Sequence, residues 1–214
     1  MRSYATITTG RTLRRLYRAG WGVFITADAL DRNGPAFRWA RSQSPPMPFA
    51  IDNGAWSAHL NDREWEPDQF RGLLGAHGED ADFTVIPDIV AGGAASLRRS
   101  LAWIPEVLAA SPVALLAVQN GIEPADVAPL LSRRVGLFVG GDTEWKISTI
   151  QTWAALGRQA GSWVHVGRVN TVNRVNMCTN AGVTSIDGTS VSRFVSNLPK
   201  LDGARRQMTL LGDE

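Results

Sequence analysis

The stretch Thr84-Val85-Ile86-Pro87-Asp88 is a short apolar run that ends in a carboxylate. A strand buried on both faces explains the apolar residues, because strands of a parallel sheet are covered on both sides. It does not explain the acid. Four other runs end in a carboxylate, an amide or a glycine pair: Phe49-Ala50-Ile51-Asp52, Leu115-Leu116-Ala117-Val118-Gln119, Leu137-Phe138-Val139-Gly140-Gly141 and Thr184-Ser185-Ile186-Asp187. The C-terminal strand ends of a (β/α)8 barrel line one pocket, so this pattern predicts a barrel with an active site at its mouth.

Strand-like and helix-like stretches alternate along the chain. Strands are expected over residues 4–9, 22–26, 49–52, 83–87, 115–119, 136–139, 163–166 and 184–187. Helices are expected over residues 12–19, 67–75, 94–110, 124–131, 148–160 and 172–181. This alternation predicts a parallel sheet. Eight strands favour closure into a compact (β/α)8 TIM barrel, and an open doubly wound sheet is the alternative.

The length and composition fit one domain over residues 1–214. The chain is 44% hydrophobic and 20% charged, which is enough for a real core and argues against disorder. Residues 31–48 are rich in Arg, Ser and Pro and are expected to form a long loop over the barrel mouth, as a lid or binding element. The polar tail from about residue 200 is expected to be peripheral.

The positive charge is mostly arginine, which binds phosphate oxygens bidentately. The net charge is only +2, but the sequence pI of about 9.1 and four arginine clusters make a polyanion partner plausible. The single cysteine, Cys178, excludes a disulfide within the chain and a cysteine-based zinc site, and it is expected to be a packing residue. No signal-like start and no run of about 18 apolar residues is present, so we expect a cytoplasmic protein without a membrane partner.

Each polar strand end also has a plain explanation. Asp52, Gln119 and Asp187 can be turn residues, and Asp88 can cap the following helix. The five endings together favour a shared site instead. Two or three carboxylates around one pocket suggest acetal or N-glycosidic chemistry, in which one acid attacks the anomeric carbon and another shuttles a proton. The remaining acid and an amide can read the edge of a purine-like base.

These motifs, in this order over about residues 45 to 195, resemble the tRNA-guanine transglycosylase superfamily, and more closely its phage and bacterial relatives that place 7-deazaguanines in DNA. The resemblance implies a nucleophile at Asp187 and proton transfer at Asp52. It also implies that Asp88, Gln119 and the Gly140-Gly141 pair bind the base. The zinc subdomain of the tRNA enzymes is missing, which makes DNA a more natural substrate than tRNA.

Further candidates surround these strand ends. Trp56 and Trp145 are expected to stack on a base, with core packing as the alternative. Arg168, Asn170 and Lys146 are expected to hold phosphate or sugar, although each can equally be an ordinary loop or surface residue. His165 should lie inside its strand as a core histidine with its hydrogen bonds satisfied.

The residues, taken with this resemblance, lead us to expect a DNA-guanine transglycosylase. It would exchange guanine for a 7-deazaguanine such as preQ0 through a covalent aspartyl intermediate, without a cofactor or metal. The target base would be flipped out of the duplex or single-stranded. A hydrolytic N-glycosidase, an enzyme of free nucleosides and a non-catalytic nucleic-acid-binding barrel are the alternatives. A homodimer or an accessory protein is compatible with the sequence.

Overall fold

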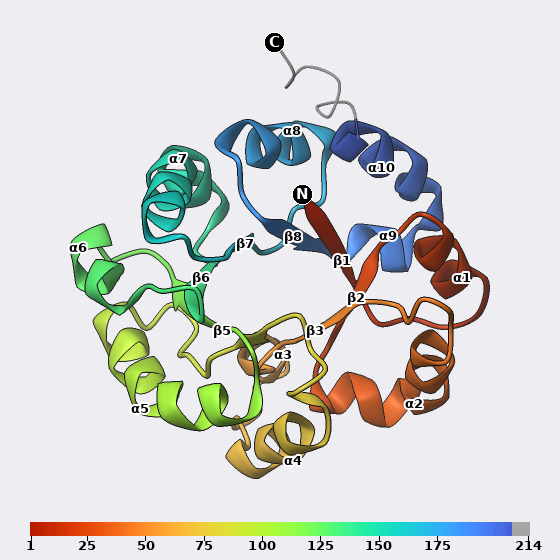
Figure 1. Cartoon of the computed structure of the whole chain (residues 1–214), viewed down its shortest axis with the longest axis horizontal. Helices are drawn as coiled ribbons and strands as arrows, with labels where there is room; N and C mark the ends of the chain where they lie inside the picture. The colour runs from red at the N-terminus through yellow and green to blue at the C-terminus, as the bar shows by residue number, and fades with distance from the viewer. Residues whose placement is uncertain (207–214) are drawn as a thin grey trace.

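The computed structural model describes residues 1–206 and shows a closed barrel of parallel strands (Figure 1). The strands pair in chain order, and the last pairs with the first, so Tyr4 lies beside Asp187. They are β1 (Arg2–Thr6), β2 (Gly22–Ile25), β3 (Phe49–Ile51), β4 (Thr84–Val85), β5 (Ala114–Val118), β6 (Val135–Val139), β7 (Val164–Val166) and β8 (Ser185–Gly188). The predicted (β/α)8 barrel is confirmed, and the open doubly wound alternative is wrong.

Helices form a ring around the strands (Figure 1). They are α1 (Gly10–Arg18), α2 (Ala27–Arg41), α3 (Ala55–Leu60), α4 (Pro67–His77), α5 (Ala94–Ala110), α6 (Pro124–Val127), α7 (Thr143–Ala160), α8 (Val172–Ala181), α9 (Ser190–Arg193) and α10 (Leu198–Arg206), with 3-10 turns η1 (Ala128–Leu130) and η2 (Val195–Asn197). The bounds of α5 and α8 are those that the sequence predicted. The short helix α3 was not expected, and α7 begins five residues earlier than predicted.

Alternation along each strand divides the core into two parts. Leu116 and Val118 of β5 belong to the larger cluster between strands and helices, whereas Leu115 belongs to the cluster inside the barrel. The interior is largely aromatic. Its rings are those of Tyr4, Phe24, Phe83, Phe138 and His165, with centroid separations of 5.0–6.4 Å between contacting pairs. The barrel below the mouth is therefore filled with side chains rather than hollow.

The expected long loop at residues 31–48 is mostly a helix. The hydroxyl of Thr26 accepts a hydrogen bond from Ala29 N at the start of α2, and the helix continues to Arg41 with a kink at Asn33. Phe37 and Ala40 are buried three residues apart on one face. The sequence indicated a loop because the many Arg, Ser and Pro residues outweigh the few apolar residues at helical spacing. Instead of forming a lid, α2 belongs to the outer ring of helices.

The beginning of the expected polar tail is also helical and packed. Leu198, Leu201 and Ala204 are buried along one side of α10, which packs against α8. Asp202 pairs with both Arg205 and Arg206 on its polar side. The prediction of a peripheral tail is wrong for residues 200–206, and its remainder at residues 207–214 lies outside the described residues. Within residues 1–206, no helix is both long and apolar enough to cross a bilayer.

Candidate active site

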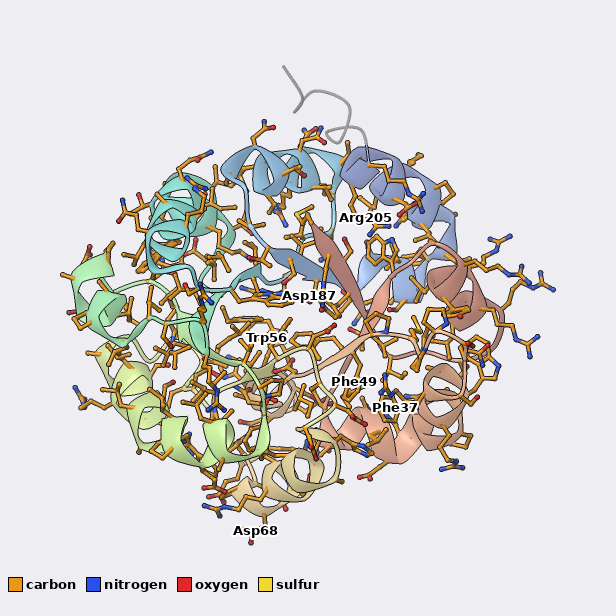
Figure 2. All side chains as sticks on the ribbon, in the orientation of Figure 1. Phe37, Phe49, Trp56, Asp68, Asp187 and Arg205 are labelled. Atoms are coloured by element: carbon orange, nitrogen blue, oxygen red, sulfur yellow. The ribbon has the colours of Figure 1, made fainter. Side chains whose placement is uncertain are left out.

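Three carboxylates meet at the C-terminal end of the barrel. Asp52 follows β3, Asp88 follows β4, and Asp187 lies within β8. The charges of Asp187 and Asp88 both act on Asp52, and Asn53 links the first two loops by a hydrogen bond to Asp88. Figure 2 shows Asp187 near the middle of the barrel and Trp56 beside it in projection. The fold therefore brings together the three acids that the sequence singled out.

Asp187 is held by one of its two carboxylate oxygens. Its Oδ1 lies 3.0 Å from Nε2 of His165 and accepts a 3.3 Å hydrogen bond from the backbone amide of Arg168. Within residues 1–206, no hydrogen bond reaches Oδ2. The side chain itself is buried. Asp187 thus has a fixed orientation and one oxygen that has no hydrogen-bond partner in the described part of the chain.

His165 is part of a row of hydrogen bonds inside the barrel. Trp163 Nε1 donates to Ser185 Oγ over 2.7 Å, and the same oxygen lies 2.7 Å from His165 Nδ1. Because an indole nitrogen can only donate, the serine hydroxyl is free to donate to Nδ1, which leaves the proton of His165 on Nε2, facing Asp187. This tautomer is assigned from the network, and it gives every group in the row a partner.

His165 is fully buried with its hydrogen bonds satisfied, as the sequence predicted. Sequence reasoning missed that one of these bonds orients Asp187. The spacing in the sequence could have shown this, because side chains two residues apart along a strand face the same side of the sheet. Ser185 and Asp187 therefore face the same side. The observed register pairs His165 with Ser185, two residues before Asp187.

Asp52 is in a different electrostatic state from that of a surface acid. Burial, together with the negative charges of Asp187 and Asp88, raises its pKa to about 7 against the opposing hydrogen bond from Gly54 N. Gly54 has a φ of +80°, which a glycine adopts without strain. It is the N-cap residue of α3, so this helix begins soon after Asp52. Asp52 can therefore exchange a proton near neutral pH.

Asn53, which sequence reasoning did not single out, organises this side of the mouth. Its Nδ2 donates to Ile86 O at 2.8 Å and to Asp88 Oδ1 at 2.9 Å, and its Oδ1 accepts from Ala55 N. Burial raises the pKa of Asp88, and the Asn53 bond opposes that change. The side chain of Asn53 thus fixes Asp88 in place relative to Asp52.

The amide and glycine positions are partly occupied by the protein itself. Gln119 Nε2 donates to Ile89 O at 2.8 Å and so secures the loop after β4. Gly140 N donates to Val118 O, so its amide is already used within the barrel. Gly141 has a φ of +57°, and a Cβ there would lie 2.4 Å from the Trp145 ring. A role for these residues in base binding stays a prediction.

The two tryptophans differ in their surroundings. Trp145 packs on Gly141, and its ring centroid lies 5.8 Å from that of Trp153. These contacts agree with the alternative that Trp145 is a packing residue. Trp56 on α3 is 39% exposed, and the Arg168 guanidinium lies 4.5 Å from its ring centroid. This cation–π contact connects the β7 side of the mouth with α3. Trp56 is therefore the better placed of the two to stack on a ligand.

The candidates for phosphate contact are not free surface groups. Lys146 is only 5% exposed, lies in the first turn of α7, and donates from Nζ to Gly167 O at 2.7 Å. Burial and the nearby Arg168 lower its pKa to about 8. Asn170 Oδ1 accepts from Ser190 N at 2.9 Å, which ties the β7–α8 loop to α9. The surface-solvation alternative for Lys146 is therefore wrong.

A small pocket lies to one side of the three acids, and neither Asp88 nor Asp187 lines it. The pocket that touches Asp52 has a volume of about 40 Å³ and extends toward α4 between Thr26, Trp65 and Phe70. That volume admits a few water molecules and no purine base. Within the described part of the chain, no group of three His, Cys, Asp or Glu side chains could hold a metal ion.

Searches against protein-family models and against curated proteins find no match to this chain. The site itself offers an oriented carboxylate at Asp187 beside a carboxyl group at Asp52 that titrates near neutrality. Two acids in such different environments are the arrangement used for nucleophilic and acid–base roles at a glycosidic bond.

Proposed function

We propose that this chain is a transglycosylase that exchanges guanine in DNA for a 7-deazaguanine, with Asp187 as the nucleophile. The observation that carries the proposal is the difference between its two neighbouring acids. Asp187 is anchored through Oδ1, and within residues 1–206 no hydrogen bond reaches its Oδ2, whereas the pKa of Asp52 is raised to about 7. One group is prepared to attack and the other to carry a proton.

In the first step, Asp187 Oδ2 attacks C1′ of the target nucleotide. The bond from C1′ to the guanine nitrogen breaks, its electron pair stays with the base, and Asp52 gives its proton to the departing guanine. In the second step, Asp52 takes a proton from the incoming base, whose nitrogen attacks C1′ and releases the Asp187 carboxylate. One residue serves as acid and then as base, as in retaining glycoside hydrolysis.

The identity of the base and the polymer rests on the resemblance described above, together with two features of the site. Asp88 and Oε1 of Gln119, which no hydrogen bond reaches within residues 1–206, supply polar groups at neighbouring strand ends. Trp56 offers a partly exposed ring on which a flipped base can stack once Arg168 moves away. Because the Arg168 guanidinium covers the Trp56 ring, we expect this contact to open when a base stacks there.

A base-exchange assay tests this proposal. Single-stranded DNA containing guanine is incubated with preQ0, and the digested nucleosides are analysed by mass spectrometry. We expect exchange with the wild-type protein, a covalent protein–DNA adduct on denaturing gels without incoming base, and neither with Asp187→Asn. Asp68→Asn, an exposed acid on α4 (Figure 2), is the control and should behave as wild type.

The alternatives give other results in the same assay. Net loss of guanine without incorporation would mean a hydrolytic N-glycosidase. Exchange on deoxyguanosine but not on DNA would mean an enzyme of free nucleosides. Exchange by Asp187→Asn at the wild-type rate would refute the proposed nucleophile, and absence of all base chemistry would favour a nucleic-acid-binding barrel.

A further inference from the structure

Three cationic side chains line a second cavity, between α7 and α8 beside the end of β7. Lys146 comes from α7, Arg168 from the loop after β7, and Arg174 from α8. Thr143 and the backbone around Gly167 complete the polar part of the lining. The cavity has a volume of about 10 Å³, so it is a notch between the cations rather than a pocket for a large ligand.

None of the three cations forms an ion pair within the described residues 1–206. Lys146 donates to Gly167 O, Arg168 to Gly141 O, and Arg174 to Thr143 Oγ1 at 3.3 Å. All three partners are neutral oxygens. Other arginines of this protein do meet carboxylates, for example Arg2 with Asp82 and Arg71 with Glu106.

Such a cluster is unfavourable without a counter-charge. A buried ammonium loses its hydration, and neighbouring cations repel it. Both arginines oppose the charge of Lys146, and Asp187 only partly offsets them. Asp142 at the start of α7 also interacts with the charge of Lys146, and its carboxylate is already bonded to Trp145 N and Asn120 Nδ2.

We infer that Lys146, Arg168 and Arg174 form a binding site for a phosphate group. A tetrahedral oxyanion can accept hydrogen bonds from two guanidinium groups and an ammonium at once, and such charge-assisted bonds are the strong ones. Arg168 and Arg174 are only partly buried and so remain accessible. Because the notch holds about one water, the phosphate sits at its outer rim between the arginines, with Lys146 behind it.

The position of the site suggests which phosphate it binds, and this step rests on the proposed function. The backbone amide of Arg168 donates to Asp187 Oδ1, so the loop that presents its guanidinium also touches the nucleophile. A phosphate bound here would flank the nucleotide that Asp187 attacks. When Arg168 turns to that phosphate, it leaves the ring of Trp56, which then becomes free to stack on the base.

Three probes separate the sources of the phosphate: inorganic phosphate, dGMP, and a single-stranded oligonucleotide without terminal phosphates. Binding is measured by calorimetry for the first two and by fluorescence anisotropy at several salt concentrations for the third. The test variant is Arg174→Gln, because Arg174 is outside the proposed catalytic groups. Arg11→Gln removes the same charge from an exposed residue of α1 and is the matched control.

We expect Arg174→Gln to weaken each interaction by about tenfold or more, the usual effect of losing a hydrogen bond to a charged group. It should also lower the salt slope of log K for the oligonucleotide by roughly 0.7, the value for one lost phosphate contact on a single strand. Arg11→Gln should leave affinity at the site unchanged. A second variant, Lys146→Met, should also weaken the binding of inorganic phosphate relative to wild type. Its circular dichroism should match wild type, which shows that the variant is folded.

Equal binding by Arg174→Gln and Arg11→Gln would overturn the site, as would failure of wild type to bind any of the three probes. Binding of inorganic phosphate and dGMP that depends on Arg174, without such dependence for the oligonucleotide, would keep the phosphate site and refute DNA as its source. Binding of all three with no base exchange would keep the site and refute the proposed function.

Discussion

The raised pKa of Asp52 predicts that this acid destabilises the folded protein at neutral and alkaline pH. Its folded pKa is about 7 against an ordinary value of 3.8, a difference of about three pH units. At 1.36 kcal/mol per unit this amounts to roughly 4 kcal/mol. Because the folded state binds the proton more tightly, stability falls as the pH rises from about 4 to 7 and is then level.

The amide in Asp52→Asn has the same shape and cannot ionise, so it should remove this dependence. We expect the difference in unfolding free energy, variant minus wild type, to increase by about 4 kcal/mol between pH 4 and pH 8. Urea unfolding at several pH values measures it, and the difference cancels every other titrating group. Asp68→Asn, whose acid is 94% exposed, should give a difference that is nearly flat.

A flat difference for Asp52→Asn would refute the reasoning. It would show that Asp52 is hydrated and ionised at neutral pH, and that it cannot be the proton donor of the first step. A difference that decreases with pH would mean that ionised Asp52 has a cationic partner in solution.

Three further predictions concern the neighbours of the site and the barrel wall. His165→Phe should keep the aromatic interior but lower stability by about 1–3 kcal/mol, because the buried Ser185 hydroxyl loses its acceptor. It should slow adduct formation by about 100-fold, because Asp187 loses its orienting bond; an unchanged single-turnover rate would contradict this. Trp56→Ala should weaken oligonucleotide binding in anisotropy titrations by roughly tenfold, since stacking contributes about 1–3 kcal/mol per base, and equal affinity would exclude a stacking role. Gly157→Ala would place a methyl carbon 2.1 Å from Val164 Cγ2, so we expect a loss of about 1–3 kcal/mol in urea unfolding, and an unchanged midpoint would show that α7 yields without cost.

The sequence predicted the barrel because eight nearly continuous apolar runs, typical of strands buried on both faces, alternate with stretches that have helical spacing. The same reasoning placed Asp52, Asp88 and Asp187 at one end, since parallel strands all finish on the same side. It failed for α2, where a helix with few apolar residues has the composition of a loop. Composition at residues 31–48 does not show that Phe37 and Ala40 meet the core.

The contacts across the mouth could not be predicted from the sequence. Arg168 and Trp56 are far apart in the chain, and only the closed barrel brings the guanidinium over the ring. The burial of Lys146 likewise depends on α7 beginning at Thr143, before the residues that carry the helical pattern. Asn53 was passed over because a turn asparagine ordinarily bonds to its own loop, whereas this one also bonds to Ile86 and Asp88 in the loop after β4.

The row of hydrogen bonds beneath Asp187 ends in a group that cannot pass on a proton. Trp163 only donates, and the guanidinium of Arg2 lies 5.2 Å from its ring at the opposite end of the barrel. The aromatic interior surrounds the imidazole of His165. The row therefore holds Asp187 in place and gives a proton no path along it to the far side of the barrel. On the proposed mechanism, protons would then reach the solution through the mouth, where Asp52 lies. In such an enzyme, the pH of the solution would act on the site only from the mouth of the barrel.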